Sequence, residues 1–269
     1  MKEISFFFQE KGAGLIDGRQ IGEYLGAKLN PREGYEEDVC IFVKQIPPEG
    51  FPAISYVNVV DGVGLIPWIA QHPSVGIIVT SLTAQSFLAR KLRRDDIVFI
   101  PEHHCNYSRE KRTRIEVTTV GMIGNIKGFN YDLRQAAERF EGVDLKFVWK
   151  TNYSKREDVV DFYKGIDIQV NWRPHVKGTH AQLHNPLKLA NAGSFGIPTV
   201  SYAEDNYEEE FRGYFYSVRD IDQLFKIVGC MKDNPSMYKS YADLSMIKSE
   251  YYHIENVARM YEILSGGHR

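Results

Sequence analysis

The sequence is short of cysteine and of long hydrophobic runs. Its three cysteines, Cys40, Cys105 and Cys230, are scattered and odd in number. Such a set predicts no disulfide framework and fits a reducing compartment. No apolar run approaches the roughly 20 residues of a transmembrane helix. The first ten residues lack the apolar core and cleavage site of a signal peptide. Together these features predict a cytoplasmic protein.

Net charge is nearly absent as well. The 33 Lys and Arg residues and the 35 Asp and Glu residues leave a formal charge of −2. This balance excludes a general electrostatic attraction to nucleic acid or anionic membrane, so such a partner would need a local patch. The hydrophobic share of 43% and the charged share of 25% are those of a globular protein. A length of 269 residues suits one large domain or two smaller ones.

Short apolar runs alternate with helical stretches in the first 100 residues. Because strands that alternate with helices imply right-handed crossovers, this rhythm predicts a parallel sheet covered on both faces. The expected strands are Ile4–Phe8, Val39–Val43, Ile54–Val60, Val75–Thr80 and Ile97–Ile100, and the expected helices run from Asp17 to Leu29, from Asp61 to Gln71 and up to Leu92.

The same rhythm restarts after a polar, basic stretch at 106–114. The expected strands are Val117–Ile123, Leu145–Trp149, Ile166–Asn171 and Ile197–Ser201, and the expected helices are Tyr131–Phe140, Lys155–Lys164, Pro186–Phe195 and two that begin near Asp220 and Pro235. We therefore predict an α/β protein with two Rossmann-like, doubly wound domains facing a cleft. The predicted division is 1–110, 111–246 and a last segment, 247–269, whose helix packs back on the N-terminal domain.

Ligands of open parallel sheets bind beyond the carboxyl ends of the strands. In the N-terminal half this rule selects Gly12, Gly14, Asp61, Glu102 and His103. The two glycines could admit a diphosphate, although a tight turn explains them equally well. Asp61 is a candidate general base or a plain helix cap. His103 is a candidate base or sugar contact, or an ordinary loop residue, and Glu102 is grouped with these two as a catalytic candidate.

Metal binding is not predicted. His103, His104 and Cys105 are consecutive, and adjacent side chains point in different directions. A zinc site needs a second ligand pair at a suitable spacing, which the sequence does not offer.

A long cationic segment runs from Arg173 to His184 and carries Lys177. Connections in α/β units usually span about 2–6 residues, so this one favours a function. It leads to a helix start with Asn185 as the expected cap and Pro186 as the first helical residue. A helix start and cations together favour an anion such as a diphosphate. The alternative is a solvated loop with an ordinary cap.

The segment from Pro186 to Val200 resembles the donor-site motif of GT-B glycosyltransferases of the group 1 type. That motif reads Pro-x-Lys-x-x-Glu-x-x-x-x-Gly-x-Pro-x-Val, and the matching residues are Pro186, Lys188, Gly196, Pro198 and Val200. Asn191 stands in the place of the motif's glutamate, and Leu183 stands where a second glutamate is often found eight residues earlier. The strand that runs into Gly124 also resembles the first strand and loop of the family's donor domain.

The resemblance implies a glycosyltransferase that needs neither metal nor cofactor. Its donor would be a nucleoside-diphosphate sugar linked to UDP or GDP, and its acceptor a hydroxyl of a glycan, a lipid-linked glycan or a nucleic acid. Two alternatives stay open: a nucleotide-sugar epimerase of the same architecture, and a catalytically silent binder. The implied donor-binding residues are Gly12, Gly14, Gly124, Asn125, Lys127, Arg173, Lys177, His184, Pro186, Leu187, Lys188 and Asn191.

Overall fold

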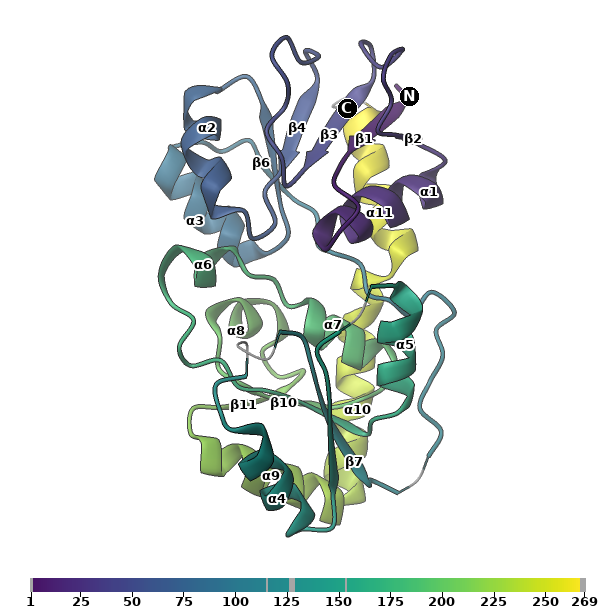
Figure 1. Cartoon of the computed structure of the whole chain (residues 1–269), viewed down its shortest axis with the longest axis vertical. Helices are drawn as coiled ribbons and strands as arrows, with labels where there is room; N and C mark the ends of the chain where they lie inside the picture. Colours follow the sequence, from purple (N-terminus) through teal and green to yellow (C-terminus); the bar gives the residue numbers. More distant parts are fainter. Residues whose placement is uncertain (1, 115, 126–128, 153, 267–269) are drawn as a thin grey trace. The chain divides into compact units, whose positions relative to one another are not determined.

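The computed structural model describes residues 2–114, 116–125, 129–152 and 154–266. Lys127, from the predicted donor loop, lies outside them. The chain forms two compact units, each built on its own sheet (Figure 1). Unit 1 comprises Met1–His103, Gly178–Asn185 and Ile254–Arg269, and unit 2 comprises His104–Lys177 and Pro186–His253.

Unit 1 contains a six-stranded sheet in the order β2-β1-β3-β4-β5-β6. All of its neighbouring strands pair in parallel, as the alternation of strands and helices predicted. The strands are β1 (Ile4–Phe7), β2 (Lys28–Leu29), β3 (Val39–Val43), β4 (Ser55–Asn58), β5 (Gly76–Val79) and β6 (Ile97–Phe99). The two-residue strand β2 was not expected from the sequence.

Helices cover both faces of this sheet (Figure 1). They are η1 (Gly14–Gln20), α1 (Ile21–Leu25), η2 (Val63–Leu65), α2 (Ile66–Gln71), α3 (Leu82–Leu92), α6 (Gly178–Leu183) and α11 (Ile254–Ser265). Ile69, Leu88 and Leu183 bring α2, α3 and α6 into one buried cluster. Helix α11 packs on β1, where the rings of Tyr261 and Phe6 lie 5.4 Å apart.

The first helix differs from the prediction. Asp17 was expected to cap a helix reaching Leu29, but it lies inside the π-helix η1, and α1 ends at Leu25. The side chain of Asp17 is buried and accepts a hydrogen bond from Asn58 Nδ2 at 3.2 Å. A Cβ on Gly14 would lie 2.0 Å from the carbonyl oxygen of Gln9. Close backbone packing therefore requires this glycine.

Unit 2 contains a five-stranded parallel sheet in the order β11-β10-β9-β7-β8. The strands are β7 (Thr119–Ile123), β8 (Lys146–Lys150), β9 (Ile168–Asn171), β10 (Thr199–Tyr202) and β11 (Tyr216–Val218). Four of them were predicted to within two residues at each end. The two parallel sheets confirm the predicted α/β class.

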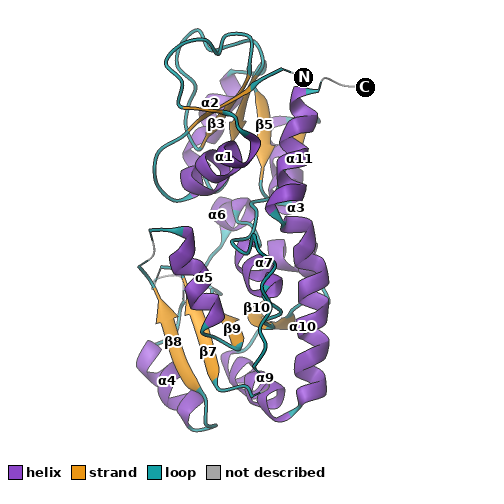
Figure 2. Ribbon diagram, turned by 90° about the vertical axis from the view of Figure 1, so that its right-hand side faces the viewer, coloured by secondary structure: helices purple, strands orange, loops and turns teal. Residues whose placement is uncertain are grey.

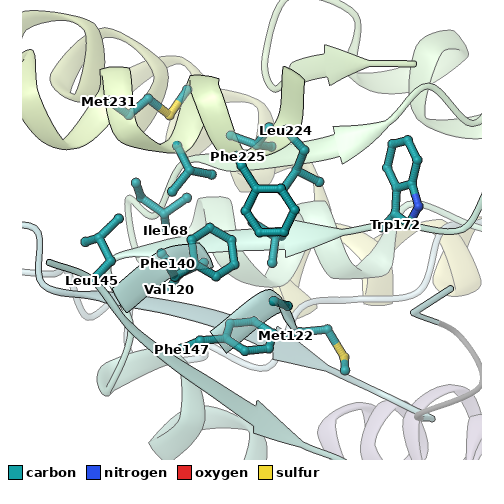
Figure 3. Close-up of a cluster of buried hydrophobic side chains, with 14 of the residues drawn as sticks. Val120, Met122, Phe140, Leu145, Phe147, Ile168, Trp172, Leu224, Phe225 and Met231 are labelled. Atoms are coloured by element: carbon teal, nitrogen blue, oxygen red, sulfur yellow. The ribbon is translucent and has the colours of Figure 1, made fainter. Parts of the chain in front are cut away.

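The helices of unit 2 also lie on both faces of their sheet (Figure 2). They are α4 (Leu133–Glu141), α5 (Arg156–Lys164), α7 (Leu187–Ser194), α8 (Asp205–Phe211), α9 (Ile221–Asp233), α10 (Pro235–Ser249) and η4 (Glu250–Tyr252). The larger core joins α4 and α9 to the sheet through Phe140, Phe225 and the strand residues around Ile168 (Figure 3). On the opposite face, Tyr163 of α5 stacks on Phe195 at the end of α7.

The predicted loop Arg173–His184 is in part a helix. Residues Gly178–Leu183 form α6, which belongs to unit 1 although the flanking segments belong to unit 2. Leu183 is fully buried in the core of unit 1. The connection is long because the chain leaves unit 2 after Lys177, contributes residues 178–185 to unit 1, and returns to unit 2 at Pro186.

The remaining boundaries also differ from the predicted division. The chain passes from unit 1 to unit 2 after His103, ahead of the basic stretch 106–114. That stretch is held to unit 2, because Arg112 and Arg114 both pair with the buried Asp167. The last segment, 247–269, was predicted to hold one helix, but it contains parts of two, since α10 ends at Ser249 and α11 begins at Ile254.

Candidate active site

Helix α7 begins at the carboxyl edge of the sheet in unit 2. Pro186 occupies its N-cap position, so the helix starts one residue later than predicted. Gln169 of β9 fixes the first turn, because its Nε2 donates to the carbonyl oxygen of Lys188 at 3.1 Å. The same Nε2 donates to Thr199 Oγ1 of β10 at 3.2 Å. The first turn of α7, with its partial positive charge, is thereby held against β9 and β10.

The ammonium of Lys188 packs on the backbone that follows β7. A Cβ built on Gly124 would lie 2.9 Å from Lys188 Nζ, and Gly124 has a φ of +120° that glycine alone adopts readily. Burial, reinforced by the positive charge of Arg173, lowers the pKa of Lys188 to about 7. Within the described ranges, Nζ has neither an ion-pair nor a hydrogen-bond partner.

Arg173 is near this lysine but its charge is already matched. Its Nε and Nη2 donate to the two carboxylate oxygens of Glu204 at 2.8 and 2.6 Å. Nη2 also donates to the hydroxyl of Tyr207 at 3.0 Å, and burial raises the pKa of that phenol. Lys188 is therefore the cation of this cluster that forms no ion pair in the described part of the chain, and the charge of Glu204 only partly opposes the lowering of its pKa.

Glu204 received no role from the sequence, although the strand ends held a signal for it. Arg173 lies two residues beyond the end of β9, and Glu204 lies two residues beyond the end of β10. The two strands are neighbours, and Ser201 pairs with Asn171 in their register. Arg173 thus lies two residues, and Glu204 three residues, beyond this pair at the same edge of two adjacent parallel strands, and their side chains meet there.

Asn191 makes a structural contact. It is buried, and its Oδ1 accepts a hydrogen bond from the backbone N–H of Cys105 at 2.7 Å. The side-chain oxygen of Asn191, which was expected to contact a ribose hydroxyl of the donor, thus binds the backbone of Cys105 instead. The other predicted donor residues of unit 2 lie in different settings: Asn125 and Lys177 are exposed, and Leu187 is the first residue of α7.

Unit 1 places a buried carboxyl at the carboxyl edge of its own sheet. Glu102 follows β6, and its Oε2 accepts a hydrogen bond from Asn185 Nδ2 at 2.6 Å. Asn185 also donates to Thr80 Oγ1 at 3.1 Å, so it does not cap α7 as predicted. Burial raises the pKa of Glu102 to about 7, and the charge of Asp61 adds to this shift. Burial and Glu102 likewise raise the pKa of Asp17.

The other two catalytic candidates of unit 1, Asp61 and His103, each contact different partners. Asp61 forms an ion pair with Lys44 on the surface and does not cap a helix. His103 is buried, with its Nε2 3.1 Å from the carbonyl oxygen of Ile16. The sequence thus identified several groups at this edge, and among them Glu102 has a raised pKa.

The raised pKa of Glu102 predicts a pH-dependent effect of its removal. A carboxyl whose pKa is higher in the folded state weakens that state as pH rises from its ordinary value of 4.5 to about 7. We expect Glu102→Gln to raise the free energy of unfolding at pH 8 by on the order of 1–3 kcal/mol, and by much less at pH 5. Denaturant titrations at the two pH values measure this difference.

The matched control is Glu49→Gln, which changes an exposed carboxyl of the same unit. We expect it to alter the free energy of unfolding by no more than about 0.5 kcal/mol at either pH. An equal effect of Glu102→Gln at pH 5 and pH 8 would contradict the raised pKa.

Two further features concern the described residues only. None of their His, Cys, Asp and Glu side chains form a group of three or more placed to hold a metal ion. Among the same residues, no helix has both the length and the apolar character needed to cross a membrane.

Comparison with known proteins gives one relative by sequence. It is a protein of Haemophilus influenzae described as an uncharacterized glycosyltransferase, and it is 24% identical over 207 residues. The match covers 67% of this chain and 58% of the relative, so the chain spans little more than half of that protein's length. No protein-family model matches the sequence.

Comparison with solved structures finds proteins of the same architecture along the whole chain. Sucrose-phosphate synthase from Thermosynechococcus elongatus superposes with a TM-score of 0.65 at 12% identity, covering 98% of both chains. WaaG, a glycosyltransferase involved in lipopolysaccharide biosynthesis, gives a TM-score of 0.63 at 9% identity and covers 98% of this chain and all of its own. HepE of Anabaena, solved with UDP and glucose, gives 0.58 at 10% identity over 99% of this chain and all of its own.

These likenesses show the fold. The chain has the GT-B glycosyltransferase architecture, which confirms the resemblance identified in its sequence. TarM is similar with a TM-score of 0.61 at 11% identity, and that match covers 86% of this chain and 55% of TarM.

Proposed function

We propose that this protein is a glycosyltransferase whose nucleoside-diphosphate sugar binds with its diphosphate at the start of α7. The observation that carries the proposal is Lys188, a cation at a helix N-terminus that packs on Gly124 and forms no ion pair in the described structure. An anion at this position would meet both the lysine charge and the helix dipole.

In this reaction the site stabilises the leaving group. When the bond between sugar and diphosphate breaks, negative charge develops on the phosphate oxygens. A preorganised ammonium and helix N-terminus lower the energy of that charge without a metal ion. The guanidinium of Arg173, balanced by Glu204, fixes the shape of the site and adds little net charge.

The donor is proposed to be a UDP- or GDP-linked sugar. HepE, which shares the fold, was solved in complex with UDP-glucose, and this supports a uridine nucleotide as the first probe. For the acceptor side we propose the carboxyl edge of unit 1. There Glu102, with a pKa near 7, is suited to exchange a proton with a hydroxyl at neutral pH.

A catalytically silent nucleotide-sugar binder is the second candidate. Both positions at which the motif carries a glutamate serve structural contacts here. Leu183 is buried in the core of unit 1, and Asn191 accepts a hydrogen bond from the backbone of Cys105. A chain without these acids could keep the donor site and lose transfer.

The decisive experiment measures the release of nucleoside diphosphate from a panel of UDP- and GDP-linked sugars. A glycosyltransferase releases UDP or GDP slowly from its own donor, by transfer to water, and faster when an acceptor hydroxyl is supplied. A silent binder shows calorimetric binding without release, and an epimerase converts the donor sugar without release. The proposal is wrong if no donor of the panel is bound or cleaved.

A further inference from the structure

Asn171 is a buried amide without a partner. It is the last residue of β9 and is 1% exposed. Neither its Oδ1 nor its Nδ2 has a hydrogen-bond partner among the described residues. Buried side-chain amides in folded proteins are normally paired, because an unpaired one loses its hydration and gains nothing in exchange. The exception calls for a partner that the chain itself does not supply.

The alternation of side chains along β9 places the amide of Asn171 on the face of the sheet that α7 covers. Side chains of a strand alternate between its two faces, so Asn171 shares a face with Gln169. Gln169 contacts the carbonyl oxygen of Lys188 in the first turn of α7, whereas Val170 faces the core on the other side. Asn171 lies two residues nearer to the carboxyl edge than Gln169, beside the helix N-terminus.

The side chain of Lys188 covers the end of β9 at which Asn171 lies. Its carbonyl is held over β9 by Gln169, and its ammonium packs on Gly124 at the end of the adjacent strand β7. The lysine side chain therefore crosses the carboxyl end of β9, where Asn171 stands. A long, flexible side chain with no ion-pair partner in the described structure can move outward when an anion attracts it.

We propose that Asn171 binds the donor at the junction of its phosphate and sugar. Its Nδ2 donates to a non-bridging phosphate oxygen at the start of α7, and its Oδ1 accepts from a neighbouring hydroxyl of the donor. A phosphate oxygen beside a sugar hydroxyl offers the acceptor and the donor that one amide requires. This inference rests on the proposed function, because it assumes that a nucleoside diphosphate occupies the start of α7.

The test is Asn171→Leu, which keeps the approximate volume and removes both unpaired atoms. We expect the ligand-free variant to be more stable than the wild type, with a thermal midpoint higher by a few degrees. We expect its affinity for UDP or GDP, whichever the wild type binds more tightly, to fall by about tenfold or more. Thermal unfolding and titration calorimetry give the two values.

Ser249→Ala is the matched control. Ser249 is also fully buried in unit 2, and its Oγ has no partner among the described residues. It lies against the other end of α7, where a Cβ on Gly193 would come within 2.2 Å of this Oγ. We expect Ser249→Ala to keep the nucleotide affinity of the wild type, since its hydroxyl is away from the helix start.

The outcomes separate this inference from the proposed function. If Lys188→Ala weakens nucleotide binding and Asn171→Leu does not, the amide is no ligand and the donor site stands. A loss of ligand-free stability in Asn171→Leu means that the amide has an internal role, and this also overturns the inference. If the wild type binds neither UDP nor GDP, both proposals fail.

Discussion

Lys188→Ala will weaken the binding of UDP or GDP by about ten- to a hundredfold, because a hydrogen bond to a charged group contributes about 1.5–3 kcal/mol. The effect is expected to be this large because Lys188 lies at the start of α7 and forms no ion pair with the described residues. Titration calorimetry at pH 7 measures the change.

The same site predicts a pH dependence. The pKa of Lys188 lies near 7 in the ligand-free protein, and an anion bound beside it favours the charged form. Nucleotide affinity should therefore fall as pH rises from 7 to 9, by up to about tenfold per pH unit. In Lys188→Ala this slope should disappear.

Lys239→Ala is the control for both measurements. Lys239 lies on α10 and pairs with Asp243 on the surface of unit 2. Its removal should leave nucleotide affinity and its pH profile unchanged. Equal affinities of the wild type and Lys188→Ala, with both proteins folded, would remove the main support for the donor site.

Glu204→Leu will lower the free energy of unfolding by on the order of 3–5 kcal/mol, because it leaves the buried guanidinium of Arg173 without its counter-charge. Both side chains are largely buried, 13% exposed for Arg173 and 7% for Glu204. The pair carries two hydrogen bonds of normal length. Denaturant titration of unit 2 within the whole chain measures the loss.

The double variant Arg173→Met with Glu204→Leu provides the comparison. Replacing both ions of a buried pair by apolar residues is often close to neutral. We therefore expect the double variant to recover more than half of the stability lost in Glu204→Leu, although Tyr207 also loses a partner. A double variant less stable than the single one would show that the ion pair stabilises the fold beyond charge matching.

The sheets could be predicted from the sequence because buried parallel strands are continuous apolar runs. Val39–Val43 was predicted to the residue, and Ile54–Val60 contains all of β4. A helix was expected to begin near Asp220, and there the side chain of Asp220 caps α9. Where a run of apolar residues meets a standard cap, local chemistry decides the structure.

The segments that could not be predicted depend on contacts distant in sequence. Asp17 looked like a helix cap, but Asn58 and the close packing of Gly14 place it inside a π-helix. Asn185 has the type of an N-cap residue, yet Glu102 and Thr80 bind its amide. In each of these cases a tertiary hydrogen bond replaces the local one.

The candidate donor site was predicted in outline. The sequence selected Gly124, Arg173 and Lys188 from three separate segments, and the structure brings them to one edge of a sheet. The sequence places Glu204 just after a predicted strand, but that it balances Arg173 depends on the register of β9 and β10. Nor could it show that Asn171 lacks a partner, because only the packed structure reveals which polar atoms are paired.

A crystal structure of the protein soaked with UDP tests the central claim most directly. The account predicts a diphosphate at the start of α7, with Lys188 Nζ within hydrogen-bonding distance of a phosphate oxygen, about 2.7–2.9 Å. It also predicts that Arg173 keeps its contact with Glu204. A diphosphate bound elsewhere in the molecule, with Lys188 still packed on Gly124, would contradict it.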